Sequence, residues 1–366
     1  MGLLREQETK YLQEALEEMR TRTPRLLNYR LPAEWEPHVA TWIAWPKNID
    51  TFPEKILPKV EETYCNIVEA LRKDERVKIM VDNEDWDSIV ENILNMHGVE
   101  TKGVEFYHIK TRDVWVRDYG PTFIISPEKK LGGVKWIFNA WGGKYPDLAE
   151  DNNAGIKLLL LSGAEVFRSD TVFEGGAIET DGGGLAIITE ESMLNDNRNP
   201  GLTREKAESI LRDYLGIEEF LWLERGLIGD DTDGHIDVFC RFVTNNKLLL
   251  VWDGRHNVPN KVIMSENKEK IEAWIKKSNR EIDLYFLPLP LGVEVLGVKV
   301  PATYANFYIS NRHILVPVFD VREDEEAINI IQDLVSDKEI IPINCRELFY
   351  GLGGIHCVTL QEPMHK

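Results

Sequence analysis

Cysteine is scarce in this sequence. The 366 residues contain four cysteines, Cys65, Cys240, Cys345 and Cys357, and no two of them have the short spacing of a zinc-binding or redox motif. So small a number in so long a chain excludes a disulfide scaffold and favours a reducing compartment. Cys65 falls in a helical pattern and Cys240 in a strand, so both are expected to be core residues.

Basic surface and membrane-spanning segments are also lacking. The formal net charge is −19, the acidic residues are spread along the chain, and no stripe of Lys and Arg is present. Nucleic acid and anionic membranes are therefore poor partners, whereas a small cation is electrostatically favoured. No apolar run free of charge is long enough to cross a bilayer, and the charged N-terminus lacks the apolar core of a signal peptide. We expect a cytoplasmic protein.

A repeating order of elements runs through most of the chain: an amphipathic helix, a short apolar strand, and then a strand or hairpin that begins with polar residues. The five units run over residues 84–138, 151–189, 203–252, 265–319 and 322–360. A strand at Val39–Trp45 and a helix at Pro53–Arg72 are expected to complete the closing unit with the C-terminal strand.

These repeats predict an α/β protein with one domain over residues 31–366. The polar segments at the starts of the strands, called polar heads below, are expected to meet near a central axis. Residues 1–30 are predicted to form a helical arm and linker outside it. Helices are expected at Thr203–Leu215, between an N-cap Thr203 and a stop at Gly216, and at Ser265–Lys277. Asn245-Asn246 and Asp181–Gly184 are typical of turns between strands.

The most informative segment is the C-terminal stretch Gly351–Pro363. Cys357 lies there in a short apolar run behind Gly353 and Gly354, a setting that suits a nucleophile at a strand end facing a pocket. A thiol needs a partner to become a useful thiolate, so other parts of the chain must supply one. The alternative is a buried strand cysteine without chemistry, the commoner fate of this residue.

Three further polar segments each open an apolar strand. Asp118 precedes a Gly-Pro turn, Glu174 precedes two glycines, and His235 and Asp237 end the acidic stretch Gly229–Asp237. Any one of these is easily explained as a solvated turn. Together with Cys357 they indicate strand ends that converge on one site. His235 and Asp237 project from the same face if their segment is extended.

The residue types allow several chemistries. The pair His235-x-Asp237 resembles half a metal site, but zinc commonly takes three protein ligands and no further histidine is suitably spaced. A papain-like Cys-His protease is another alternative, although its cysteine is expected early in the chain. Paired carboxylates beside a Cys-His pair suit a planar cation, because two carboxylates can clamp a guanidinium in one plane. That arrangement favours guanidine deimination.

The chain resembles the agmatine deiminases of the arginine-deiminase-like (pentein) superfamily. The resemblance covers about residues 31–363 and rests on the segments Leu31–His38, Trp115–Thr122, Phe173–Gly176, Asn195–Pro200, Asp230–Asp237 and Gly354–Cys357. It implies a five-bladed α/β propeller of helix–strand–strand units, a homodimer, and hydrolysis of agmatine to N-carbamoylputrescine and ammonia. No cofactor and no metal are implied.

The resemblance also implies roles for individual residues. Cys357 matches the nucleophile that forms an amidino-cysteine intermediate, and His235 matches the general acid and base. Asp118 and Asp237 match the carboxylates that hold the guanidinium, and Glu174 matches the carboxylate paired with the histidine. Three additional residues are expected to contact the substrate: Trp115, Trp141 and Asp231.

Departures from the family pattern leave the substrate open. They lie at Gly354, where Asn is common, at Glu179, where His is usual, and after Cys357, at Leu360. Free arginine would need a cation for its carboxylate, which Arg225 or Arg241 could supply. Peptidyl-arginine would need a site with an entrance wide enough for a peptide. A protein that binds guanidino ligands without turnover is the non-enzymatic alternative.

Arg117 is a potential ion-pair partner of Asp118, and His356 is expected to point away from the site.

Overall fold

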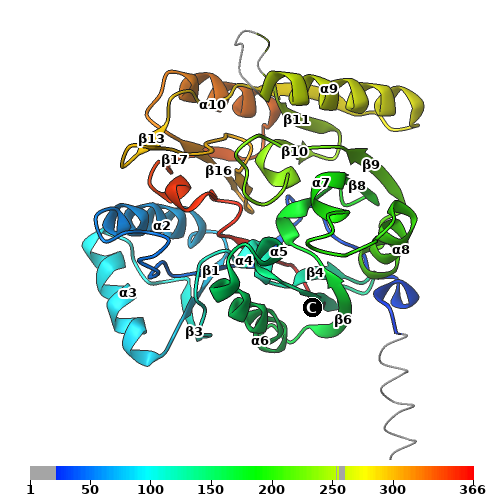
Figure 1. Ribbon diagram of the computed structural model, residues 1–366. Coiled ribbons are helices and arrows are strands. Elements are labelled where there is room, and N and C mark those ends of the chain that lie inside the picture. Colours follow the sequence, from blue (N-terminus) through cyan, green and yellow to red (C-terminus); the bar gives the residue numbers. More distant parts are fainter. Residues whose placement is uncertain (1–21, 253, 255–259) are drawn as a thin grey trace, which may run out of the picture.

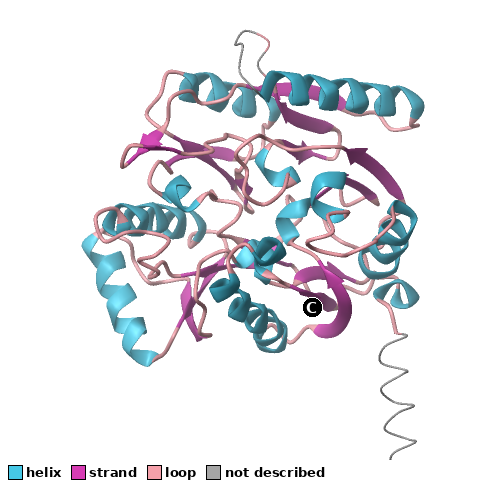
Figure 2. Cartoon of the chain, in the orientation of Figure 1, coloured by secondary structure: helices cyan, strands magenta, loops and turns pink. Residues whose placement is uncertain are grey.

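The structure is a computed structural model that describes residues 22–252, 254 and 260–366 (Figures 1 and 2). It is a mixed α/β protein, as predicted, in which the longer helices lie at the outside and the strands lie within them. Most of the predicted N-terminal arm, residues 1–21, lies outside the described residues. No helix within the described ranges has the length and apolar character needed to span a bilayer.

Five sheets share one pattern, an antiparallel pair extended by a parallel strand, and the first of them has a fourth strand. The first sheet has the order β18 (Leu360–Pro363), β1 (His38–Ala44), β2 (Arg76–Val81), β3 (Val104–His108). The other four are β4 (Thr122–Ile125), β5 (Leu131–Ile137), β6 (Glu165–Val172); β7 (Ile178–Thr180), β8 (Leu185–Thr189), β9 (Glu219–Leu223); β10 (Cys240–Thr244), β11 (Lys247–Val251), β12 (Asp283–Leu287); and β15 (Tyr308–Ile309), β16 (His313–Val318), β17 (Glu339–Asn344). A separate two-stranded hairpin is formed by β13 (Glu294–Val295) and β14 (Val298–Lys299).

Helices connect the parallel strands. The longer ones are α2 (Leu57–Leu71), α3 (Glu84–Met96), α6 (Ala154–Leu161), α8 (Arg204–Leu215), α9 (Asn260–Lys277) and α10 (Glu323–Leu334). Short helical turns are η1 (Pro24–Leu27), α4 (Val116–Tyr119), α5 (Ala140–Gly143), η2 (Pro146–Asn153), η3 (Gly175–Ala177), α7 (Glu190–Met193), η4 (Ile236–Val238) and η5 (Leu348–Gly351). Each parallel pair thus encloses a crossover helix, as parallel pairing requires.

Five repeated units were predicted, and five of the six sheets among the described residues share one pattern, but the predicted grouping of strands was wrong. The units grouped each helix and its strand with the hairpin that follows, whereas the structure pairs that strand with the preceding hairpin. In the second sheet, β6 pairs in parallel with β5, with Phe167 opposite Val134. Hydropathy locates strands but not their partners, because every buried strand has the same apolar pattern.

The closure of the first sheet by the C-terminus is confirmed. β18 pairs antiparallel with β1, with Leu360 opposite Trp42, so the two ends of the domain share one sheet. The predicted C-terminal strand 355–360 was wrong in its bounds, because residues 355–358 form a turn and the strand begins at Leu360. Cys357 therefore lies in the turn that leads into β18.

Local signals for helices and turns were reliable. The Thr203 hydroxyl accepts a hydrogen bond from the Lys206 amide at the start of α8, and Gly216 ends that helix with a φ of 67°. α9 contains the predicted segment and begins five residues earlier, at Asn260. The turns at Asn245-Asn246 and at residues 181–184 join β10 to β11 and β7 to β8, as expected.

The three predicted polar heads lie in short helical turns rather than in strands. α4 carries Asp118 just before β4, Glu174 is the N-cap of η3 before β7, and His235 is the N-cap of η4 before β10. Extended heads would send alternate side chains to opposite faces, whereas one helical turn can send neighbouring residues to one side. Figure 1 shows α4 near the middle of the molecule, and both α4 and η4 contact η3.

Candidate active site

The polar heads of three sheets converge in the interior. His235 Nε2 lies 3.6 Å from Glu174 Oε2, and His235 Nδ1 lies 3.8 Å from Asp118 Oδ1. All three side chains are almost completely buried. The contacts are those of loose ion pairs and are too long for hydrogen bonds, so neither nitrogen of His235 has a hydrogen-bond partner among the described residues.

Gly176 lies at the centre of this group. Its amide donates a 3.1 Å hydrogen bond to Asp118 Oδ1. A Cβ at this position would come within 2.7 Å of His235 Nδ1, 2.9 Å of Asp237 Oδ2 and 3.0 Å of Asp118 Oδ1. The Glu-Gly-Gly motif is thus explained by space: the second glycine lets a histidine and two carboxylates approach one backbone segment.

Cys357 lies beside these residues. Its Sγ is 3.8 Å from Asp237 Oδ2 and 3.3 Å from the side-chain nitrogen of Asn306. Cys357 is 5 % exposed and lies on the wall of a cavity, in the position expected for a nucleophile with access to a ligand. Gly353 is needed for a similar reason to Gly176, because a Cβ there would come within 2.4 Å of the Trp115 ring.

The cavity in front of Cys357 has a volume of about 360 Å³. Asp118 and Cys357 lie on its wall together with three of the predicted substrate contacts, Trp115, Trp141 and Asp231. Asp50, Asp113 and Asp147 add further carboxylates, and none of the lining residues is Lys, Arg or His. The cavity therefore has an aromatic and acidic wall, which suits a cation with an apolar stem.

Trp141 is held firmly against the site. Its indole N–H donates a 3.0 Å hydrogen bond to Asp118 Oδ2, and its backbone is in the left-handed region, with φ 52° and ψ 53°. This conformation is unfavourable for a residue with a side chain and is typical of functional sites. Asp231 lies further out and accepts a hydrogen bond from the Tyr145 hydroxyl.

The carboxylates control the protonation of His235. Burial alone would lower the pKa of His235, but the charges of Asp118 and Glu174 outweigh it and raise the pKa to about 9. Burial raises the pKa of Asp118 to about 6. The charge of His235 opposes this rise, and the negative charges of Asp237 and Glu174 add to it. Near neutral pH, His235 is therefore an acid with a proton to give.

The other three groups have distinct environments. Burial would raise the pKa of Glu174, but it is lowered by His235 and by Arg198, whose Nε donates a 2.8 Å hydrogen bond to Glu174 Oε1. Burial would also raise the pKa of Asp237, but contact with His356 lowers it. Burial and the charges of Asp237 and Asp118 raise the pKa of the Cys357 thiol well above its usual value. An added cation between these groups would oppose that effect.

Asn306 was missed by the sequence analysis. Its Oδ1 accepts hydrogen bonds from the His356 and Cys357 amides, at 3.1 Å and 3.4 Å, and its Nδ2 contacts the thiol. Asn306 precedes β15, the first strand of the fifth sheet, so it occupies the position that Asp118, Glu174 and His235 occupy in their sheets. The sequence signal was this equivalence, which becomes visible only when the strands are grouped as the structure pairs them.

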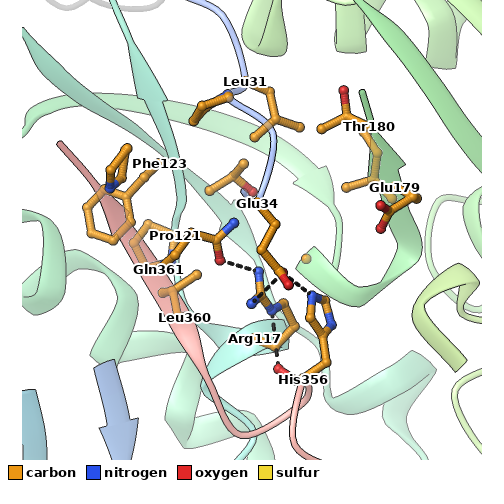
Figure 3. A pocket seen from close by; sticks show the side chains of 15 residues that line it. Leu31, Glu34, Arg117, Pro121, Phe123, Glu179, Thr180, His356, Leu360 and Gln361 are labelled. Carbon is orange, nitrogen blue, oxygen red and sulfur yellow. Dashed lines mark hydrogen bonds and ion pairs between the residues drawn. The ribbon is translucent and has the colours of Figure 1, made fainter. Parts of the chain in front are cut away.

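His356 was predicted to point away from the site, and this was wrong. Its Nδ1 lies 2.7 Å from Asp237 Oδ2 and its Nε2 lies 2.7 Å from Glu34 Oε2. A turn at residues 355–358, in place of the expected strand, gives His356 and Cys357 neighbouring directions. Figure 3 shows Glu34 between His356 and Arg117. Arg117 is paired with Glu34 at 3.5 Å, and no ion pair joins it to Asp118.

The two arginines suggested for a substrate carboxylate lie elsewhere. Arg241 is fully buried, and its guanidinium donates to Glu34 Oε1 at 2.9 Å and to Glu179 Oε2 at 2.8 Å. Arg225 pairs with Glu266 and its side chain is 50 % exposed. Neither lines the cavity. The departure at Glu179 is thus an ion-pair partner of Arg241 inside the protein, outside the ligand cavity.

Two further findings limit the chemistry. Asp237 Oδ1 is buried without a hydrogen-bond partner among the described residues, although Oδ2 is bonded to His356. Within residues 22–252, 254 and 260–366, no three His, Cys, Asp or Glu side chains are grouped to hold a metal ion. The site offers a thiol, an acidic histidine and, at Asp237 Oδ1, a buried carboxylate oxygen without a hydrogen-bond partner in the described chain.

Comparison with known proteins places this geometry in context. A family model for Porphyromonas-type peptidyl-arginine deiminases matches residues 30–363. Agmatine deiminases of Ectopseudomonas mendocina and Stutzerimonas stutzeri are 34 % and 33 % identical to the chain, and each match covers 94 % of this chain and 98 % of the relative. The structure of the agmatine deiminase of Enterococcus faecalis is similar with a TM-score of 0.84 at 28 % identity, over 93 % of this chain and 97 % of that one.

Proposed function

The chain belongs to the Porphyromonas-type peptidyl-arginine deiminase family, and from this membership we propose that it hydrolyses agmatine to N-carbamoylputrescine and ammonia. It is a hydrolase that acts on C–N bonds of amidines. The observation that carries the proposal is the placement of Cys357 and Asp118 at one cavity, with Asp237 3.8 Å from the thiol and His235 behind Asp118.

Substrate binding comes first in the proposed mechanism. The guanidinium lies between Asp118 and Asp237, where Asp237 Oδ1 has no hydrogen-bond partner in the described part of the chain and Asp118 is already oriented by Trp141. Two carboxylates in one plane match the fork of guanidinium N–H donors. The cation also stabilises the Cys357 thiolate, since the thiol otherwise faces two negative charges. The thiol is thus activated by the ligand it attacks.

The thiol loses its proton to solvent as the cation binds, and the thiolate then attacks the guanidinium carbon and forms a C–S bond. His235 is protonated at neutral pH, because its pKa is about 9, and it gives its proton to one amino group of the tetrahedral intermediate. The C–N bond breaks, ammonia leaves, and an amidino group remains on Cys357. Glu174 holds His235 in place from the other side, 3.6 Å from Nε2.

Water completes the reaction. His235, now neutral, accepts a proton from the water that attacks the amidino carbon. The C–S bond breaks, the thiolate is restored, and the urea product carries the oxygen of that water. The sum is one guanidine and one water converted to one ureido compound and one ammonia, with no redox change and no cofactor.

The lining of the cavity supports a substrate without a carboxylate. Among the lining residues are five aspartates and no basic side chain. A primary ammonium at the far end of an alkyl chain would meet Asp231 and its acidic neighbours, and the chain itself would pack on Trp115 and Trp141. Free arginine would bring its carboxylate to this acidic wall without a cation. Peptidyl-arginine, which the family description names, remains the second candidate substrate.

Further parts of the proposal concern the whole molecule. The five sheets act as five blades of an α/β propeller, with the polar heads around its axis, and residues 31–366 form one domain that carries residues 1–30 as an arm. We expect a cytoplasmic homodimer. Analytical ultracentrifugation of the full chain and of a chain that begins at residue 22 tests both the dimer and the part played by the arm.

Ammonia release tests the reaction. Purified protein is incubated with agmatine, free arginine or a blocked arginine peptide, beside the variant Cys357→Ala. We expect release with agmatine that the variant lacks, while the variant still binds agmatine in calorimetry. Release with another guanidine only would overturn the substrate and keep the chemistry. Binding of agmatine without release by the unaltered protein would support the non-enzymatic alternative.

A further inference from the structure

His356 has no part in the proposed chemistry, yet it is almost fully buried beside the nucleophile. It contacts a carboxylate on each side, with both N···O distances at 2.7 Å. Two contacts this short to carboxylate oxygens each need a hydrogen, so the ring and its two partners share two protons between them. Asp237, His356 and Glu34 thus form one continuous hydrogen-bonded array behind the substrate cavity.

The array is anchored at the end remote from Cys357. Glu34 Oε1 accepts from Arg241 at 2.9 Å and from the Ile309 amide at 2.8 Å, and Arg117 lies 3.5 Å from Oε2. With two arginines and an amide around it, Glu34 stays ionised; its pKa lies far below the usual range although burial alone would raise it. Glu34 therefore fixes the orientation of the His356 ring.

The other end of the array is open. Asp237 gives Oδ2 to His356 and leaves Oδ1 without a partner, although the whole side chain is buried. His356 does not line the cavity that contains Cys357; it lines a separate cavity of about 50 Å³ together with Glu34 and Arg117 (Figure 3). The side chain of His356 thus contacts the substrate site through Asp237.

We propose that His356, held by Glu34, is a positioning residue that keeps Asp237 ionised and turns its free Oδ1 toward the guanidinium. The inference rests on the proposed function of the site. Charged and titratable groups face Asp237 from every segment around it: Asp118, Asp230, His235, Arg241, His356 and Cys357. Of these, His356 Nδ1 lies 2.7 Å from Asp237 Oδ2, and the Cys357 thiol lies 3.8 Å from the same oxygen.

The direction of the pH effect follows from the contact. Guanidinium binding needs ionised Asp237, so affinity is lost as the pH falls through the pKa of this carboxylate. His356 lowers that pKa, and without it the loss of affinity moves to higher pH. A histidine that only fills space would change the stability of the protein and leave this pH dependence unchanged.

The test measures agmatine binding by calorimetry between pH 5 and 9 in protein that carries Cys357→Ala, so that no turnover occurs. Adding His356→Leu is expected to weaken binding about tenfold or more, the usual size for a charge-assisted hydrogen bond. The loss of affinity at low pH, the acid limb of the binding profile, is expected to move to higher pH. His356→Asn, whose amide can still donate to Asp237, is expected to restore most of both. Glu179→Gln is the matched control, because Glu179 is a buried partner of Arg241 without contact to His356 or Asp237.

The outcomes separate the two proposals. If Cys357→Ala alone does not bind agmatine or another guanidine, the proposed function fails. If it binds agmatine and His356→Leu leaves both the affinity and the acid limb unchanged, the inference fails and the function stands. Should His356→Leu not fold, Glu34→Gln replaces it: loss of the Glu34 charge is expected to move the acid limb in the same direction, and an unmoved limb overturns the inference.

Discussion

The two sides of the reacting group differ in how tightly they are built. On the buried side, Asp237, His356, Glu34 and Arg241 are joined by contacts of 2.7 to 2.9 Å. On the substrate side, His235 lies 3.6 Å from Glu174 and 3.8 Å from Asp118, and its nitrogens lack hydrogen bonds. Among the described residues, only Asp237 Oδ1 lacks a hydrogen-bond partner on the buried side, whereas on the substrate side both ring nitrogens of His235 lack one.

This difference separates two kinds of buried charge. Complete networks act on stability, because removing one member leaves another buried charge without compensation. Incomplete clusters act on binding and catalysis, because their oxygen atoms and nitrogens are aimed at groups that arrive with the substrate. Substitutions that break the buried ion pairs should therefore lower stability, whereas substitutions of groups that reach the substrate, directly or through Asp237, should change binding and catalysis.

The largest effect on catalysis is expected from the substrate side. His235→Gln removes the group that protonates departing ammonia and later activates water, while a neutral polar side chain fills the space. We expect kcat to fall about 10⁴-fold or more, because both steps lose their proton carrier, with little change in the melting temperature. Steady-state kinetics and thermal unfolding check this, and a fall below tenfold would remove His235 from the acid–base role.

The largest effect on stability is expected from the buried side. Arg241→Met removes a fully buried guanidinium and leaves Glu34 and Glu179 without their shared partner. The free energy of unfolding should fall by about 3–5 kcal/mol, the usual cost of breaking a buried ion pair. Chemical denaturation measures it. The exposed Arg225→Ala is the control, since its surface pair with Glu266 should contribute about 1 kcal/mol or less.

A smaller effect on catalysis is expected from Asp118, one of the two carboxylates proposed to hold the guanidinium. Asp118→Asn keeps the shape and the hydrogen bond from Trp141 but removes the charge that attracts the guanidinium and holds the proton on His235. We expect kcat/KM to fall about 10²- to 10³-fold, and the alkaline limb of its pH profile to move to lower pH. An unchanged alkaline limb would show that Asp118 does not control the pKa of His235.

The mildest perturbation is pH itself. Asp118 must be ionised to bind the cation, and burial sets its pKa at about 6, so kcat/KM should decline below that value. His235 must be protonated to release ammonia, so with a pKa raised to about 9 by the neighbouring carboxylates, kcat/KM should decline above that value. Because Asp118 and His235 interact, the two apparent pKa values of the pH profile describe the pair of residues together. A profile that rises steadily through pH 9 would contradict the acid role of His235.

Sequence reasoning identified more of the site than of the fold. Cys357, Asp118, Glu174, His235 and Asp237 could be predicted because glycine-bearing polar segments before apolar strands are unusual, and the structure brings all five together. The backbone conformation of the segments that carry them was predicted less well. These segments form short helical turns and the turn at residues 355–358, where strands were expected. Short polar segments have weak conformational preferences, so tertiary contacts decide their shape.

The missed residues have a common reason. Asn306 and Glu34 are single polar residues, each far along the chain from Cys357, and neither spacing nor composition marks them. His356 was assigned to the wrong face because a strand was assumed where the chain turns. The pairing of each parallel strand with the preceding hairpin was likewise hidden, because all the strands are similarly apolar.

The sequence by itself determined the α/β class, the order of the main helices and strands along the chain and the reactive side chains, because hydropathy periods, caps and glycine-bearing turns are local properties. Only the tertiary structure decided which strands pair, which cavity the thiol faces and which carboxylate oxygen stays free. Those features depend on contacts between residues as distant as Glu34 and His356, where burial and neighbouring charges set both geometry and protonation.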